Sequence, residues 1–136
     1  MNPMKQLQVV VLLVIAAALL GGARADAASW TALTPTGEEP GASGDYCVQH
    51  MVWAGANYYG DVAVRCAGLT PGATYHVEVW DLDPWAGFIP VGGGSFTVTK
   101  RGTGQVTVAD VPFFMLGPPY VEVRNAGDIV VLTSQY

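Results

Sequence analysis

Basic residues are scarce in this sequence, and charged residues of either sign are few. Of the 136 residues, six are Lys or Arg and eleven are Asp or Glu, so only 12% of the chain is charged. Nucleic acids and anionic lipid surfaces are bound largely through Lys and Arg. The composition therefore predicts no nucleic-acid partner and no anionic membrane partner.

Long apolar runs are limited to the beginning of the chain, where residues 1–25 have the pattern of an export signal. Lys5 precedes an unbroken apolar run, Val9 to Leu20, and the small residues of "GGARA" follow it at a signal peptidase site. We expect cleavage after Ala25, with Ala27 as the second choice. An uncleaved membrane anchor is the alternative, but the 12-residue run is shorter than the ~18–20 residues that a spanning helix needs.

Removal of the signal would leave a single domain, residues 26–136, with an irregular N-terminal stretch. Lys5 and Arg24 would be lost with the signal, so four basic residues would face eleven acidic ones and the net charge would be near −7. A chain of this length suits one domain with a modest core. We expect a secreted or periplasmic bacterial protein that has no membrane association after cleavage.

Cysteine is limited to Cys47 and Cys66. An even number of cysteines in an exported chain predicts one disulfide, and the 18 intervening residues lack the CxxC spacing of structural zinc sites. A hairpin that turns at Ala56–Asn57 would place the two cysteines directly opposite each other, close enough for a bridge.

Motifs that identify enzymes are absent. The sequence contains no G-x-S-x-G, HExxH or glycine-rich phosphate loop. His50 and His76 are the only histidines, and each lies in a strand-like segment. Gly92–Gly94 is not followed by Lys-Ser/Thr or by a helix, and predicts a flexible loop. We expect no catalytic residue and no cofactor, although two carboxylates at a suitable distance for a hydrolase can come from anywhere in a fold.

Most of the remaining chain alternates between apolar and polar residues, which is the pattern of β-strands. No segment shows a sustained helical period, and Gly and Pro separate the strand-like segments. These segments are 45–53, 58–66, 74–80, 94–100, 105–111, 120–127 and 128–134, with a possible short strand near 30–33. Seven or eight such strands predict an all-β, antiparallel sandwich or small barrel.

The stretch "LTPGATY", Leu69 to Tyr75, predicts a specific turn. Pro71 and Gly72 suit the central positions of a type II turn, and Tyr75 then begins a strand with its ring inward and its hydroxyl hydrogen-bonded. This stretch resembles the tyrosine corner of immunoglobulin-like and fibronectin type III domains. With the segment from Gly94 to Val106, it is also similar to small exported bacterial β proteins. The resemblance implies a single immunoglobulin-like sandwich.

Two kinds of ligand site suggest themselves after Tyr75. Trp80, Trp85 and Phe88 are candidates for binding a sugar or a protein, if their rings are exposed; we expect the loop after Pro84 to fold back and form a closed plug over Trp80 instead. Asp81 and Asp83 are weak calcium candidates; the simpler interpretation is that they cap a turn, and we assign no metal.

These observations predict an exported, non-enzymatic structural or adhesion-type module. Its partner is unknown, and a protein or glycan at the cell exterior is the class we expect. A carbohydrate-binding module that uses exposed tryptophans is the first alternative, and a small extracytoplasmic hydrolase is the second. Clustered exposed aromatic residues would favour the first alternative, and a pocket with two acids near His50 or His76 would favour the second.

Overall fold

The structure, a computed structural model, describes residues 30–114 and 118–134, so the predicted signal peptide lies outside the described residues. The chain divides into two units at Trp30, and all strands of the described residues lie in the second unit, Thr31–Tyr136. The strands are β1 (Thr31–Pro35), β2 (Ser43–Ala54), β3 (Asn57–Ala67), β4 (Thr74–Asp83), β5 (Gly87–Thr97), β6 (Gly104–Phe113), β7 (Tyr120–Arg124) and β8 (Val130–Thr133).

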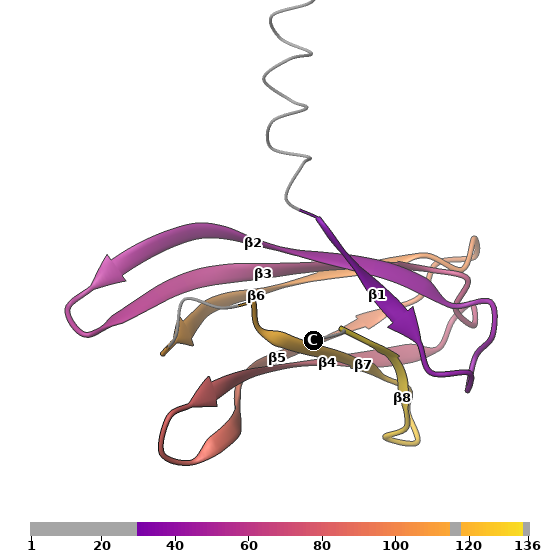
Figure 1. Cartoon of the computed structure of the whole chain (residues 1–136). Coiled ribbons are helices and arrows are strands. Elements are labelled where there is room, and N and C mark those ends of the chain that lie inside the picture. Colours follow the sequence, from indigo (N-terminus) through magenta and orange to yellow (C-terminus); the bar gives the residue numbers. More distant parts are fainter. Residues whose placement is uncertain (1–29, 115–117, 135–136) are drawn as a thin grey trace, which may run out of the picture. The chain divides into compact units, whose positions relative to one another are not determined.

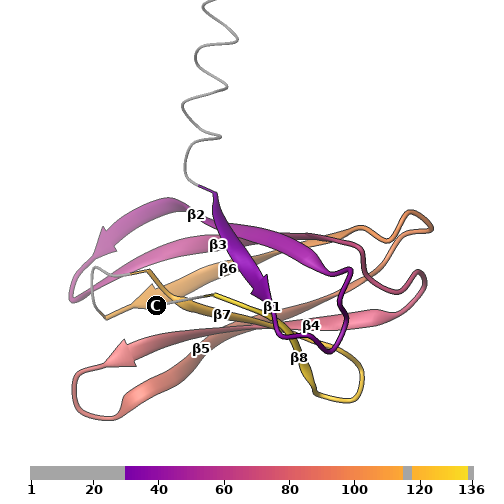
Figure 2. The same cartoon turned by 45° about the vertical axis from the view of Figure 1, so that its right-hand side comes forward.

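The eight strands form one antiparallel sheet in the order β5-β4-β7-β8-β1-β2-β3-β6, which curls into a nearly closed barrel (Figures 1 and 2). The prediction of an all-β antiparallel fold is confirmed, but the predicted two-sheet sandwich is wrong. The reason is β1, which pairs with β2 through Thr31–Leu33 and with β8 through Thr34–Pro35. This strand joins the two halves of the sheet into one.

The predicted flexible loop at Gly92–Gly94 is also wrong, because these residues belong to β5 and pair with β4. β5 and β6 are the two edges of the sheet, and they pack against each other where the barrel closes. A Cβ at Gly92 would lie 2.9 Å from Cγ1 of Val108, and one at Gly94 would lie 3.0 Å from Cγ2 of Val106. The glycines therefore let the valines of β6 approach the β5 backbone, which covers both edges.

The hairpin of β2 and β3 has a different register from the predicted one. Ala54 pairs with Asn57, so the chain turns at Gly55–Ala56, one position earlier than expected. A β-bulge between Gln49 and Val52 then shifts the pairing by one more residue. The early turn moves each cross-strand partner by two positions and the bulge moves it by one, so the pairing of Cys47 is displaced by three positions.

The predicted disulfide between Cys47 and Cys66 is absent because of this displacement. Cys47 lies opposite Ala63, and an odd displacement turns the two cysteine side chains to opposite faces of the sheet. Both cysteines are buried. Burial raises the pKa of Cys66 to about 12, so its thiol stays protonated and is a poor nucleophile for disulfide exchange.

The predictions for the turn before β4 are confirmed. Gly72 has a φ of +79°, and the N–H of Ala73 donates to the carbonyl of Thr70. The Tyr75 ring is 2% exposed and stacks on Phe96 with a centroid distance of 5.9 Å. The Tyr75 hydroxyl accepts a hydrogen bond from the N–H of Thr70 and donates one to Glu39, which ties the loop before β2 to the barrel core.

Candidate functional site

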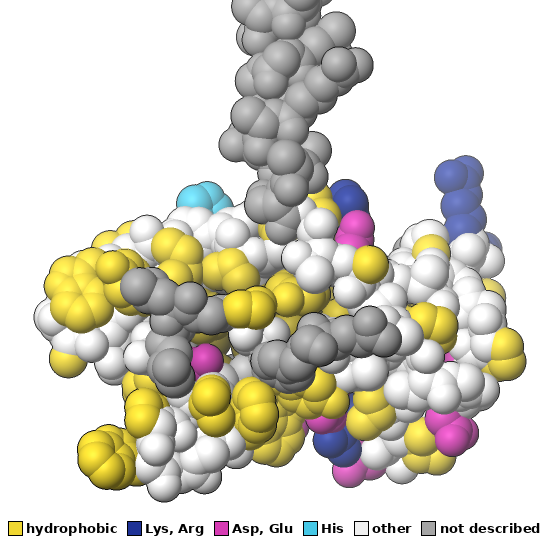
Figure 3. Space-filling view, viewed as in Figure 1, with side chains coloured by type: hydrophobic (Ala, Val, Ile, Leu, Met, Phe, Trp, Pro, Cys, Tyr) yellow, Lys and Arg dark blue, Asp and Glu magenta, His cyan; other side chains and the backbone are white. Residues whose placement is uncertain are grey.

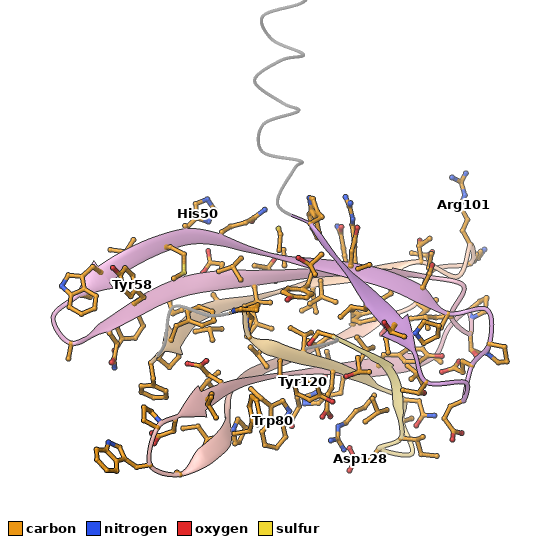
Figure 4. All side chains as sticks on the ribbon, viewed as in Figure 1. His50, Tyr58, Trp80, Arg101, Tyr120 and Asp128 are labelled. Atoms are coloured by element: carbon orange, nitrogen blue, oxygen red, sulfur yellow. The ribbon has the colours of Figure 1, made fainter. Side chains whose placement is uncertain are left out.

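Strand β4 orients its side chains as the alternation predicts. Tyr75, Val77 and Val79 point into the barrel, and Trp80 lies on the outer face beside Tyr120 of β7 (Figure 4). Trp80 is only partly exposed, and its indole Nε1 is buried without a hydrogen-bond partner among the described residues. Trp80 is therefore not an open platform for a ligand.

Trp85 lies at the tip of the β4–β5 hairpin and is 96% exposed. The carboxylate of Asp83 accepts hydrogen bonds from the N–H groups of Trp85 and Ala86, at 2.7 and 2.9 Å. These two bonds hold the turn as an extension of the hairpin. The expected plug is therefore wrong, because the Trp85 ring points away from the barrel and does not cover Trp80. Phe88 is half-exposed, and its ring lies 6.1 Å from that of Tyr120.

Three segments meet at this end of the barrel. The tip of the β2–β3 hairpin adjoins the end of β6, since Tyr58 pairs with Phe113. The end of β6 adjoins β4, because the carboxylate of Asp81 accepts a 2.6 Å hydrogen bond from the N–H of Phe114. The tips of both hairpins consequently lie at the same end of the barrel, the left side of Figure 1.

Exposed large apolar side chains are concentrated at this end. Among the described residues, Ile129 in the β7–β8 turn is the one such side chain that lies elsewhere. The other eight are Met51, Val52, Trp53, Tyr59, Leu82, Trp85, Phe88 and Phe114, and we call them the aromatic end. Figure 3 shows large apolar side chains over both hairpin tips on the left. A concentration of this kind is typical of an interaction surface.

The sequence carries a signal for this surface that the search for ligand residues missed. Residues 51–60, 84–99 and 111–121 contain no charged side chain, and these runs supply seven of the eight residues of the aromatic end. Trp53, which is 57% exposed and packs edge-on against Tyr58, was not among the candidates for ligand binding. The basic side chain of Arg101 lies at the opposite end of the barrel from Tyr58 (Figure 4).

The two calcium candidates, Asp81 and Asp83, both accept hydrogen bonds from backbone N–H groups. Asp81 is buried and accepts a hydrogen bond from Phe114, and Asp83 caps the turn at Trp85. No group of three or more His, Cys, Asp or Glu residues within 30–114 and 118–134 is arranged to hold a metal ion. The structure thus gives both carboxylates a capping partner.

His50 lies at a bulge of β2 and contacts the carboxylate of Asp61. His50 has a φ of +55°, and its Nδ1 lies 3.1 Å from Asp61 Oδ2. The other oxygen of Asp61 accepts a hydrogen bond from the N–H of Asp110, which also has a positive φ of 54°. These contacts lower the pKa of Asp61, the N–H of Asp110 first and His50 second. Asp61 on β3 therefore stabilises a bulge on each of the two strands that flank it, β2 and β6, which is a structural role.

A second polar row lies on the outer face of β4 and β5. His76 Nδ1 is 3.2 Å from the hydroxyl of Ser95, and His76 Nε2 is 3.7 Å from Glu78. The residue types are those of a nucleophilic triad, but Ser95 lies on a paired strand of the sheet rather than on a sharp turn with free backbone N–H donors. The arrangement suits a polar cross-strand contact.

An open depression of about 720 Å³ lies near the β5–β6 turn, with hydroxyl groups from Ser43, Thr97 and Thr103 in its lining. Its cation, Arg65, is already engaged by Asp45 through two hydrogen bonds of 2.6 and 2.9 Å. The Asp45 carboxylate accordingly raises the pKa of Arg65. This pairing leaves the depression without a free positive charge for an anionic ligand.

Comparison with known proteins adds no family. No family model matches the sequence, and a search of the curated proteins finds no similar protein. The likeness to immunoglobulin and fibronectin type III domains therefore consists of the turn and the tyrosine corner. No helix in residues 30–114 and 118–134 is long and apolar enough to cross a membrane.

Proposed function

We propose that this chain is an exported, non-enzymatic adhesion-type module that attaches to its target through the aromatic end. The observation that carries the proposal is the gathering of eight exposed large apolar side chains from three segments at one end of the barrel. Holding such residues in water is unfavourable. A function in binding gives a reason for their position, and the apolar run at residues 9–20 supports export.

The structure offers weaker support for the two alternative functions. A sugar-binding site on Trp80 and Trp85 would need both ring faces open, and Trp80 is largely covered. A hydrolase would need a pocket that holds acids near a histidine. His50 is exposed beside a single carboxylate, and His76 lies on the outer face of β4 with Glu78 as the one carboxylate that pairs with it among the described residues.

The proposal predicts that changes at the aromatic end remove binding without unfolding the barrel. The chain recovered after export is mixed separately with phosphatidylcholine vesicles, cellulose and chitin, and the bound fraction is sedimented. We expect at least one of these materials to retain the chain, and the double variant Trp53→Ala, Trp85→Ala to lose retention at least about tenfold, as the loss of two large apolar contacts implies.

Ile129→Ala is the matched control, because Ile129 is also exposed and apolar but lies in the β7–β8 turn. Its retention should equal that of the natural chain, and the thermal unfolding of both variants should be close to that of the natural chain. Retention by none of the three materials, or equal loss in the control and the double variant, would contradict the proposed function.

A further inference from the structure

We propose that the partner of the aromatic end is the surface of an uncharged, zwitterionic lipid bilayer, with the β2–β3 and β4–β5 tips entering the headgroup region. This inference rests on the proposed function and names its partner. It is carried by three features of the end: the form of the tips, the hydrogen bonding of their backbone and polar groups, and the absence of basic residues.

The two tips end in apolar side chains that point outward. Trp85 is almost fully exposed, and Trp53, which packs edge-on against Tyr58, is 57% exposed. Trp53 and Trp85 come from different hairpins that lie one above the other on the left side of Figure 1. Separate protruding tips suit a soft surface that can close around each of them. Tryptophan is also the side chain that favours the interface between water and lipid.

The backbone of the more exposed tip carries few unsatisfied donors. The carboxylate of Asp83 accepts hydrogen bonds from the N–H groups of Trp85 and Ala86, and Pro84 has no N–H. Backbone groups that enter a lipid layer must be satisfied within the protein, because little water remains there to bind them. The turn meets that requirement. The charge of Asp83 at the base of the tip limits entry to the headgroup region.

The same hydrogen bonds argue against a sugar at this end. A glycan is recognised by polar side chains that converge beside an aromatic ring. The acids next to the tips are Asp61, Asp81 and Asp83, and each of these carboxylates already accepts a hydrogen bond from a backbone N–H group. The three uncharged runs contain no further carboxylate or basic group. Their exposed side chains offer a ligand mainly apolar contact.

Charge selects the kind of lipid. The three runs contain no Lys or Arg, and the whole chain carries a formal charge of −5. Anionic lipid would repel such a chain, whereas a zwitterionic surface presents no net potential. The sequence led us to expect no membrane association after cleavage, and this inference departs from that expectation. The scarcity of basic residues argues only against anionic surfaces. A bilayer without net charge suits a surface that has apolar tips and, in the three runs, no Lys or Arg.

The test is flotation of the exported chain with vesicles of phosphatidylcholine, and with vesicles in which part of that lipid is replaced by phosphatidylglycerol. We expect flotation with the first, weaker flotation with the second, and little change with added salt on phosphatidylcholine alone. Trp53→Ala and Trp85→Ala should each lower the bound fraction about tenfold. Ile129→Ala should change it less than about twofold, because an exposed side chain outside the contact adds nothing.

Fluorescence locates the contact. Tryptophan emission of the natural chain should shift to shorter wavelength on phosphatidylcholine and be quenched by lipids brominated near the headgroup, and the Trp85→Ala variant should lose part of both effects. All variants share the same N-terminal segment, so any difference between them reports the tips alone.

Several outcomes would overturn the inference. Retention of the chain by cellulose or chitin, with no flotation on phosphatidylcholine, would assign a glycan and leave the proposed function intact. Sedimentation equilibrium showing a dimer that Trp85→Ala dissociates would assign a second copy. Stronger flotation with phosphatidylglycerol would show that the charge argument fails. Equal flotation of Trp85→Ala and Ile129→Ala would show that the tips are not the contact.

Discussion

Replacement of Gly68 by alanine is expected to lower the free energy of unfolding by at least about 3 kcal/mol. A Cβ at this position would lie 1.9 Å from the carbonyl oxygen of Gly41, which is backbone and cannot rotate away. The φ of Gly68 is also +68°, where a side chain adds strain. The substitution should separate the loop before β2 from the end of β3, and urea denaturation measures the loss.

Gly72→Ala is the matched control for this prediction. Gly72 has a φ of +79°, but no atom lies within 4 Å of a Cβ placed there. Its substitution should therefore cost only the conformational term, about 1 kcal/mol. Equal losses for Gly68→Ala and Gly72→Ala would show that the close contact with Gly41 does not exist.

Replacement of Tyr75 by alanine is expected to cost about 3–5 kcal/mol of unfolding free energy, as for other buried aromatic side chains. The ring is 2% exposed and stacks on Phe96. Tyr75→Phe keeps the ring and removes the hydroxyl, which bonds to the N–H of Thr70 at 3.2 Å and to Glu39 at 2.5 Å. Its cost should be smaller, about 1–3 kcal/mol, because both partners lose a bond.

Tyr59→Phe is the control for the hydroxyl, since Tyr59 belongs to the exposed aromatic end. It should change the unfolding free energy by about 0.5 kcal/mol or less. Chemical denaturation of the three variants under one set of conditions gives the comparison. An alanine variant of Tyr75 that is as stable as the natural chain would contradict the tyrosine corner and its role in the core.

Local patterns in the sequence were sufficient to predict most of the strands, although not the first half of β5, and the faces of β4. The period of two along residues 74–80 puts Tyr75, Val77 and Val79 on one face of the strand, and all three are buried. The nearly continuous apolar run before Ser134 is typical of a central strand, and β8 lies between β7 and β1 with Val131 and Leu132 both buried. These features depend on neighbours in the chain, and the period of a strand is enough to show them.

The register of β2 and β3 depends on distant contacts, which is why the disulfide was predicted wrongly. His50 adopts a positive φ that no local motif demands. Its bulge is supported by Asp61 and by the absence of a side chain at Gly60, where a Cβ would lie 2.6 Å from Met51 Sδ. The barrel likewise depends on β1, whose change of partner after Leu33 has no signature in five residues.

The candidate site was predicted only in part. Trp85 and Phe88 were among the proposed ligand residues and are exposed, whereas Trp80 is largely covered. The proximity of Trp53 to the β4–β5 tip could not be predicted from the sequence. It depends on the pairing of β3 with β6 and on the contact between Asp81 and Phe114. The three uncharged runs were the feature of the sequence that indicated this surface. They lie at one end of the barrel because of the strand order, which the runs themselves do not reveal.

Acrylamide quenching of tryptophan fluorescence tests the central claim, that an exposed aromatic end exists on the folded barrel. The natural chain is compared with Trp85→Phe and Trp80→Phe, and the difference spectra isolate each residue. We expect the emission from Trp85, which is 96% exposed, to be quenched almost as strongly as free indole, and that from Trp80 to be protected. Protection of Trp85 to the same degree as Trp80 would contradict the exposed tip, and the proposed binding surface with it.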